Sequence, residues 1–267
     1  MQPTQPRVCA VSYLNTVPLV WGFTHSPDPA LRDVFDLRFA LPSLCAQQMA
    51  SGEADIGILP VIETARQQLD YFPGTGIACH GPVRTILLIS KVPYAQIKTL
   101  AVDTGSRTSV MLSRVILAER YGATPRVFAQ VADMEAMLAQ ADAALIIGDP
   151  ALLIDPATIP YACLDLGAEW VNMTGLPMVF AVWSARKELI REPYLQAFKE
   201  SCRYGLDHMD DIVREQSPIR GISEQLTRDY LTKHIVFELG ERDYEGMRRY
   251  LDLALALDRV TISGGTV

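Results

Sequence analysis

The sequence predicts an α/β protein built as two lobes. Short apolar segments typical of buried strands alternate with segments of helical periodicity, and 267 residues, 49% of them hydrophobic, suffice for two cores. The chain also has two positions where a strand leads out of one such region and into another. We expect these hinges near residues 91–93 and 178–181. Lobe 1 would then comprise residues 1–91 and 182–267, lobe 2 would be the inserted residues 94–177, and a central cleft would separate them.

The composition excludes several classes of function. A net charge of −7 argues against a general nucleic-acid-binding protein, but not against a small anionic ligand held at a local positive spot. The first residues lack the basic start and apolar core of a signal peptide, and no apolar run is long enough for a bilayer. We therefore expect a cytoplasmic protein without membrane contact.

Cysteine and histidine usage bears on cofactors. The five cysteines are scattered without a C-x-x-C pair, which is typical of reduced packing residues. The four histidines show no spacing suited to a shared metal ion. We therefore expect neither a metal nor another cofactor.

The first predicted strand, residues 7–11, ends in a polar loop. Ser12, Tyr13 and Asn15 follow it, and ligands of open α/β sheets bind at the carboxyl ends of strands. Asn15 offers a donor and an acceptor, which suits ligand binding, but it could equally cap the following helix.

The other elements of the first lobe continue the alternation. Glu63 follows one of the strands; it could be a catalytic acid, although a solvated surface carboxylate is the commoner case. The predicted strands and helix are residues 36–41, 42–49 (the helix), 54–59 and 85–90.

The second lobe begins with a hydroxyl-rich turn. A strand at 100–102 passes through this turn into a helix at 106–121. Unpaired N–H groups and the helix dipole attract an anion to such a helix start. Ser106, Thr108 and Ser109 add hydroxyl donors there. A plain N-cap with nothing bound is the alternative, but one hydroxyl suffices for a cap and this turn has three.

Further along, a fully apolar strand at 143–147 suits a parallel sheet buried on both faces. Asp149 follows it at a strand-to-helix corner, where it either caps the helix or faces a ligand. Strands are also predicted at 126–131, 161–166 and 178–183. After residue 183 the pattern is wholly helical, with helices at 187–190, 192–213, 224–235 and 243–257.

Five stretches, in order along the chain, together resemble one family. They are Val11–Leu19, Ser51–Pro60, Asp103–Ser109, Ile147–Asp149 and Trp170–Trp183. They are similar to the MqnA/MqnD family of menaquinone biosynthesis by the futalosine route. The Tyr-Leu-Asn and Ser-Arg-Thr-Ser motifs favour its chorismate dehydratase branch over the 1,4-dihydroxy-6-naphthoate synthases. The resemblance implies a type II periplasmic-binding-protein fold used in the cytoplasm as an enzyme.

The resemblance also implies roles for individual residues. Asn15 and a hydroxyl on the Gly-Pro-Val-x-Ser strand would be catalytic. This chain has Thr85 in place of that serine, which keeps the hydroxyl but restricts its rotamers. The substrate-binding residues would be Ser12, Tyr13, Ser106, Arg107, Thr108, Ser109, Asp149 and Thr174.

The implied reaction removes water from chorismate and gives 3-[(1-carboxyvinyl)oxy]benzoate, which makes the enzyme a hydro-lyase. Its protein must neutralise two carboxylates, orient the ring and exclude water. No well-placed histidine or lysine is available as a base. The base is therefore either the enolpyruvyl carboxylate of the substrate or a side chain such as Asp149.

Three other functions fit the same fold. A solute-binding protein would need export, and a ligand-sensing regulator would need a fused DNA-binding helix-turn-helix, for which we find no sequence signal. The sibling synthase acting on a futalosine derivative is the third. Turnover of chorismate with loss of one water would separate all three from the dehydratase.

Overall fold

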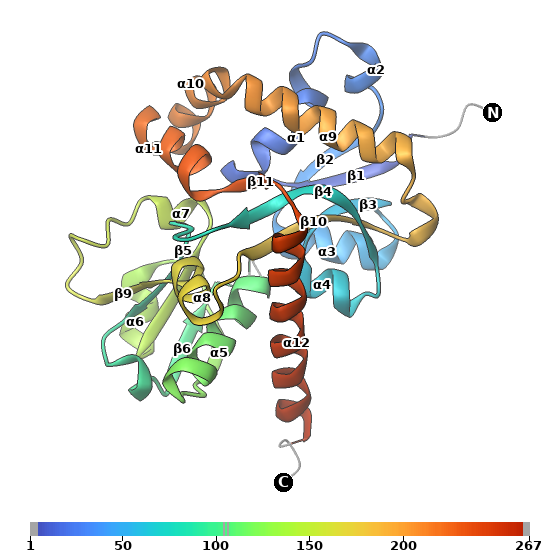
Figure 1. Cartoon of the computed structure of the whole chain (residues 1–267). Helices are drawn as coiled ribbons and strands as arrows, with labels where there is room; N and C mark the ends of the chain where they lie inside the picture. The colour runs from blue at the N-terminus through green and yellow to red at the C-terminus, as the bar shows by residue number, and fades with distance from the viewer. Residues whose placement is uncertain (1–4, 104, 106, 264–267) are drawn as a thin grey trace. The chain divides into compact units, whose positions relative to one another are not determined.

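The computed structural model describes residues 5–103, 105 and 107–263. The chain divides into two compact units. Unit 1 comprises Met1–Ala78 and Val179–Gly240, and unit 2 comprises Cys79–Met178 and Glu241–Val267. Each unit contains one β-sheet with helices packed around it (Figure 1).

Among the described residues, six strands form the sheet of unit 1, in the order β11-β4-β10-β3-β1-β2. β1 runs parallel to β2 and β3, whereas β10 runs antiparallel to β3 and β11 antiparallel to β4. The strands are β1 (Arg7–Val11), β2 (Asp36–Ala40), β3 (Ile56–Pro60), β4 (Asp70–Cys79), β10 (Met178–Ala185) and β11 (Val236–Glu238).

Helices and an aromatic cluster complete unit 1. Phe198 is fully buried and packs against Phe72, Phe35 and Trp183, with ring centroids 4.3–5.0 Å apart. The helices are η1 (Leu14–Thr16), α1 (Val17–His25), α2 (Pro29–Arg32), α3 (Pro42–Ser51), α4 (Val61–Arg66), η3 (Lys187–Leu189), α9 (Glu192–Asp207), α10 (Met209–Arg220), α11 (Glu224–Asp229) and the π-helix η4 (Tyr230–His234).

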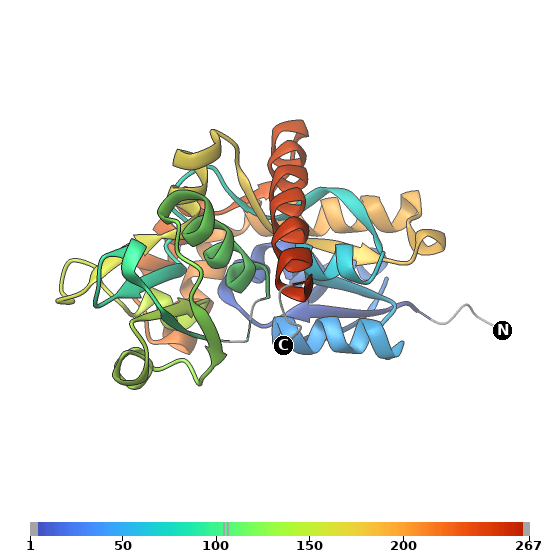
Figure 2. The ribbon, with the colours of Figure 1, turned by 90° about the horizontal axis from the view of Figure 1, so that it is seen from below.

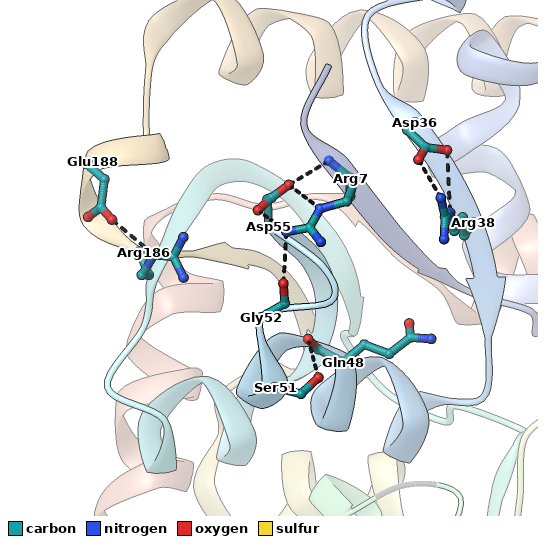
Figure 3. A network of polar contacts seen from close by, with 9 residues as sticks. All are labelled: Arg7, Asp36, Arg38, Gln48, Ser51, Gly52, Asp55, Arg186 and Glu188. Atoms are coloured by element: carbon teal, nitrogen blue, oxygen red, sulfur yellow. Dashed lines mark hydrogen bonds and ion pairs between the residues drawn. The ribbon is translucent and has the colours of Figure 1, made fainter. Parts of the chain in front are cut away.

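A polar network joins the amino ends of two neighbouring strands in unit 1. The Arg7 guanidinium donates to both oxygens of Asp55, at 2.7 and 2.9 Å, and to the Gly52 carbonyl at 2.8 Å (Figure 3). The Arg7 backbone N–H donates to the same carboxylate at 2.9 Å. These contacts fasten the start of β1 to the residue that precedes β3, and they lower the pKa of Asp55.

The sheet of unit 2 has the order β7-β6-β8-β5-β9. β6 is parallel to β7 and β8, and β5 is antiparallel to β8 and β9. The strands are β5 (Ile86–Ser90), β6 (Thr99–Val102), β7 (Arg126–Ala129), β8 (Ala143–Ile147) and β9 (Ala162–Asp165). The helices are η2 (Tyr94–Gln96), α5 (Arg107–Tyr121), α6 (Met134–Gln140), α7 (Asp149–Leu152), α8 (Leu166–Thr174) and α12 (Glu241–Ser263).

The structure corrects the expected boundaries of the two lobes. The first passage lies between Ala78 and Cys79 and not at residues 91–93, because β5 pairs along its whole length with β8 in the second sheet. The second passage, between Met178 and Val179, falls within the expected range of 178–181. Sequence periodicity marked β5 as a buried strand but could not say which sheet contains it.

The last helix also belongs to a different unit from the expected one. α12 packs along α5 in unit 2, as both views show (Figures 1 and 2). Gly246 allows this helix to approach Pro177 closely, since a Cβ at that position would lie 2.0 Å from the Pro177 carbonyl oxygen. The chain therefore passes between the units a third time, at Gly240–Glu241.

Other local predictions were wrong. The region after residue 183 is not wholly helical, because the strand β11 interrupts it, and β4 was not predicted. Glu63 is buried, with 3% of its surface exposed, and pairs with Arg66 at 3.1 Å, so it is not a solvated carboxylate.

The cysteines agree with the prediction of reduced thiols. In the described part of the chain all five cysteines are free thiols, and burial raises the pKa of Cys163 to about 11 and that of Cys202 to about 12. Of the helices within the described ranges, none is both long enough and apolar enough to cross a membrane.

Candidate functional site

The first candidate region is the turn of residues 12–16, here named the Asn15 turn, which follows β1 in unit 1. The Ser12 N–H donates to the Ala40 carbonyl at 3.0 Å, which continues the pairing of β1 and β2. The Thr16 N–H donates to the Tyr13 carbonyl at 3.0 Å and closes a 3₁₀ turn. Asn15 is thereby placed just past the carboxyl end of a strand, as expected.

The Asn15 side chain is held on one side only. Its Nδ2 donates to the Tyr230 hydroxyl at 3.1 Å. Its Oδ1 is buried and has no hydrogen-bond partner among the described residues, and the same is true of the neighbouring Thr16 Oγ1. Buried polar atoms are seldom left unpaired in proteins, so these two oxygens indicate a position where a ligand could bond.

The alternative role for Asn15, a helix cap, is wrong. Tyr13 is the N-cap of η1 and Thr16 that of α1, and neither helix has a side-chain cap bond. The amide of Asn15 is therefore not consumed in helix capping.

The Asn15 turn is also contacted from α10. The Arg220 guanidinium donates to the Ser12 carbonyl at 3.3 Å and to the Gln216 side chain. A pocket of about 270 Å³ opens beside Ser12 and is lined in part by Val17, Phe39 and Arg220. A second pocket, of about 370 Å³, lies in unit 2. Ser12 itself is exposed and Tyr13 half-buried.

The second candidate region lies at one edge of the sheet in unit 2. Val102 at the end of β6 pairs with Leu145 of β8, and Ile147 at the end of β8 pairs with Ile86 at the start of β5. The segments that follow β6 and β8, and the residue that precedes β5, therefore meet at this edge. This brings together Thr85, Arg107, Thr108, Ser109 and Asp149.

The described residues 103, 105 and 107–109, here named the α5 turn, lead into α5 and form its first positions. The Asp103 carboxylate accepts from the Gly105 N–H at 2.9 Å. Thr108 and Ser109 are buried in the first turn of the helix, whereas Arg107 is exposed. The Thr108 carbonyl accepts from the hydroxyl of Tyr250 in α12 at 3.1 Å, which fixes the backbone of this turn from behind. Thr104 and Ser106 lie outside the described residues.

Thr85 is buried with 2% exposure, and its backbone is held tightly. Its hydroxyl donates to the Val83 carbonyl at 3.4 Å, and its carbonyl accepts from the Gly148 N–H at 2.9 Å. The preceding Arg84 has a φ of 67° and donates from its side chain to the carbonyls of Ala151 and Ile154, at 3.0 and 2.6 Å.

Asp149 does not cap the helix that follows it. Gly148 is the N-cap of α7, with a φ of 66°, and Asp149 is the first helical residue. The capping interpretation is therefore wrong. Asp149 is half-buried and lies at the same sheet edge as Thr85.

Thr174 is not brought together with the other predicted residues of unit 2. Its hydroxyl donates to the Trp170 carbonyl at 2.8 Å and accepts from the Leu176 N–H at 3.1 Å, so it closes the end of α8. It lines the pocket of about 370 Å³ with Glu119, which lies about 16 Å along α5 from Thr108 at 1.5 Å per residue.

Sequence reasoning did not identify Arg220, Tyr230 or Tyr250, whose side chains contact predicted residues. Each lies in a helical segment whose local pattern gives no sign of a distant partner. No group of three or more histidine, cysteine or acidic side chains within the described ranges could hold a metal ion.

Comparison with known proteins identifies the relatives of this chain. A family model described as menaquinone biosynthesis matches residues 6–256. A chorismate dehydratase of Thermus thermophilus is 28% identical over 236 residues, which cover 82% of this chain and 86% of that protein. A chorismate dehydratase of Campylobacter jejuni is 23% identical over 252 residues, which cover 93% of this chain and 97% of that protein.

Solved structures share the fold at lower identity. Protein AF1704 from Archaeoglobus fulgidus has a TM-score of 0.77 at 16% identity, covering 97% of this chain and 99% of its own. The periplasmic aliphatic sulphonate binding protein SsuA from Escherichia coli has a TM-score of 0.65 at 15% identity, covering 97% and 89%. The predicted α/β fold of the periplasmic-binding-protein kind is confirmed. Since the family model spans most of the sequence, the chain belongs to the menaquinone biosynthesis family.

Proposed function

We propose that this protein is a chorismate dehydratase that acts in the cytoplasm, without a cofactor, in menaquinone biosynthesis by the futalosine route. The observation that carries the proposal is the buried Oδ1 of Asn15, which lacks a partner among the described residues at the carboxyl end of β1. Family membership and the similarity to two chorismate dehydratases support it.

The reaction is a net loss of water across two neighbouring ring carbons. The bond from the ether-bearing carbon to its hydrogen breaks, and the electron pair moves into the ring toward the conjugated ring carboxylate. The neighbouring carbon then loses its hydroxyl group, which leaves with a proton as water. The ring becomes aromatic, and the enolpyruvyl ether stays in place in 3-[(1-carboxyvinyl)oxy]benzoate.

Asn15 suits the step in which the hydroxyl leaves. One N–H of its amide is engaged by Tyr230, which leaves the second N–H and Oδ1 for the substrate. The N–H could donate to the departing oxygen, while Oδ1 accepts from a neighbouring hydroxyl. Such an oriented donor is most effective when charge develops on the leaving oxygen.

The α5 turn suits the binding of a carboxylate. Its backbone is fixed by Asp103 from within and by Tyr250 from behind, and the exposed Arg107 adds a positive charge. The positive end of the α5 dipole acts in the same direction. We assign Ser106, Arg107, Thr108 and Ser109 to this role, Thr85 to catalysis, and Ser12, Tyr13 and Asp149 to substrate contacts.

The choice of proton acceptor depends on which basic groups belong to the candidate regions. The four histidines, at positions 25, 80, 208 and 234, belong to neither the Asn15 turn nor the α5 turn. The enolpyruvyl group that carries this carboxylate is joined through its ether oxygen to the carbon that loses its proton, so the carboxylate can reach that proton internally. We therefore favour the substrate as its own base, with Asp149 as the alternative.

The test is to incubate the purified protein with chorismate and to follow the products by mass and by ultraviolet absorbance. We expect loss of one water and the spectrum of a benzoate. Binding of chorismate without conversion would instead indicate a non-catalytic anion-binding protein, and conversion of a futalosine derivative alone would indicate the sibling synthase. Either result would overturn the proposal.

A further inference from the structure

We propose that Tyr230 is a positioning residue that orients the Asn15 amide for the dehydration; this inference rests on the proposed function. The Tyr230 hydroxyl lies 3.1 Å from Asn15 Nδ2 and accepts a hydrogen bond from it. Tyr230 has only 1% of its surface exposed, so this contact is shielded from water.

An asparagine amide needs such a partner to act as an oriented group. The angles adopted by its terminal torsion are broadly distributed, and the two ends of the amide, Oδ1 and Nδ2, differ little in size. The hydrogen bond from Nδ2 to the Tyr230 hydroxyl holds the amide plane, and in this arrangement Oδ1 is the end that does not contact Tyr230. Oδ1 is then held as the acceptor, and it is this atom that is buried without a partner among the described residues.

Tyr230 itself is placed by an uncommon piece of backbone. It is the first residue of the π-helix η4, which continues directly from α11. A π turn contains one more residue than an α turn, so it changes the direction of the side chains that follow, and such turns occur frequently at functional sites.

The segment around Tyr230 is anchored on both sides. Before it, the Ser217 hydroxyl of α10 donates to the Thr227 hydroxyl of α11 at 2.8 Å, and both side chains are buried. After it, β11 pairs with β4 through Val236 and Ala78. With its backbone fixed in this way, the tyrosine hydroxyl can hold a partner in one position.

A second contact joins the segment before Tyr230 to the Asn15 turn. Arg220, the last residue of α10, donates to the Ser12 carbonyl at 3.3 Å. Residues 220 and 230 therefore meet the Asn15 turn at its first residue and at its catalytic side chain. One contact holds the backbone of the turn and the other the amide.

The experiment compares Tyr230→Phe with the wild type in steady-state kinetics on chorismate, following the aromatic product. Tyr230→Phe keeps the buried ring and removes only the hydroxyl. We expect kcat to fall about 3- to 10-fold, the worth of one neutral hydrogen bond, while KM stays within about twofold. Tyr204→Phe is the matched control, because its hydroxyl donates to a backbone carbonyl, that of His25, at 3.3 Å. It should leave kcat unchanged.

A double-mutant cycle with Asn15→Ala separates positioning from a structural role. If Tyr230 acts through Asn15, then Tyr230→Phe should change kcat by less than about twofold once the amide is absent. A purely structural contribution would lower the melting temperature and would change kcat by the same factor in both backgrounds.

Two results would overturn the inference alone: an active wild type with unchanged kcat in Tyr230→Phe, or equal effects in both backgrounds of the cycle. A folded wild type that does not convert chorismate would overturn the proposed function, and this inference with it.

Discussion

The Asn15 turn and the α5 turn are built alike, but a tyrosine contacts a side chain in the first and the backbone in the second. Each follows the carboxyl end of a strand, and each receives a buried tyrosine hydroxyl from the C-terminal part of the chain. Tyr230 contacts a side-chain amide, whereas Tyr250 contacts the backbone carbonyl of Thr108.

This difference suits the two turns to different roles, turnover for the Asn15 turn and binding for the α5 turn. Fixing one amide defines the position of a single donor and acceptor, which suits an interaction made in the transition state. Fixing a stretch of backbone defines the positions of several N–H groups together, which suits recognition of an anion that does not change in the reaction. Variants of the Asn15 turn should therefore affect turnover, and variants of the α5 turn should affect binding.

Asn15→Ala should have the largest effect. Loss of one oriented donor typically lowers the turnover number about 10²- to 10³-fold, and KM should move little, because the interaction strengthens in the transition state. Asn15→Asp should be equally poor, since it places a carboxylate beside a substrate that carries two. Steady-state kinetics on folded variants measures both. Retention of most of the turnover number, or a loss confined to KM, would show that Asn15 only binds.

Replacement of Ser106 and Ser109 together by alanine should act on binding. Each lost hydrogen bond to a charged group is worth about 1.5–3 kcal/mol, so the dissociation constant for chorismate or its product should rise at least about tenfold. Titration calorimetry measures it. Ser113→Ala is the control, because Ser113 lies in the same helix, is fully buried and donates to the Val110 carbonyl at 2.7 Å. Equal dissociation constants for all three proteins would remove the α5 turn from the binding site.

Two substitutions of Thr85 test whether its hydroxyl contributes to turnover. Thr85→Val keeps the shape of the side chain and removes the hydroxyl, so a catalytic role predicts a kcat lower by about tenfold, the worth of one hydrogen bond of about 1.4 kcal/mol. Thr85→Ser should keep most of the wild-type kcat, because the hydroxyl remains and only its rotamer restriction is lost. If Thr85→Val is as active as Thr85→Ser, the hydroxyl contributes packing alone.

Asp55→Asn should reduce stability and leave both kinetic constants unchanged. Its contacts with Arg7 (Figure 3) lie at the amino end of β1, whereas the Asn15 turn follows the carboxyl end of that strand. We expect a loss of about 1 kcal/mol in the free energy of unfolding at neutral pH. Asp36→Asn is the control, since Asp36 pairs with Arg38 on an exposed strand face and should contribute less.

The pH dependence of this loss has a defined direction. The Arg7 guanidinium lowers the pKa of Asp55 in the folded state. The stabilisation is therefore complete above the ordinary aspartate pKa of about 4 and disappears as the pH falls through the lower, folded-state value. Chemical denaturation at several pH values should show wild type and Asp55→Asn converging in acid. A difference that persists in acid would mean that the pair contributes through packing.

Local sequence patterns predicted much of the fold. In each candidate region they predicted the polar residues of the turn but not the distant residues that contact them. The alternation of strand and helix from β5 to β10 was predicted because strands such as β8 are continuously apolar and helices such as α5 carry apolar residues at helical spacing. β4 was missed because Pro73, Gly74 and Gly76 interrupt it, and such residues argue against a strand. β11 is too short, at three residues, to show a pattern.

The partners of the candidate residues could not be predicted, for a different reason. Asn15 and Tyr230 are 215 residues apart in sequence, so no local periodicity connects them. Tyr230 lies where a helix was expected, and it begins a π turn that the sequence pattern does not indicate. The motifs therefore predicted which groups would face the substrate, and the structure shows which groups contact them.

The path of the chain between the units has a consequence for biosynthesis on the ribosome. In the sheet of unit 1, β10 lies between β3 and β4, yet about 100 residues of unit 2 are translated between β4 and β10. A nascent chain that has reached residue 178 therefore holds two separated pieces of the first sheet and the complete set of strands for the second. Unit 1 closes only after β10 and β11 emerge, and unit 2 receives α12 later still. Such a chain depends on its final segments to complete both units, so a stalled or truncated translation product would expose apolar strands of unit 1 and become a substrate for chaperones and proteases.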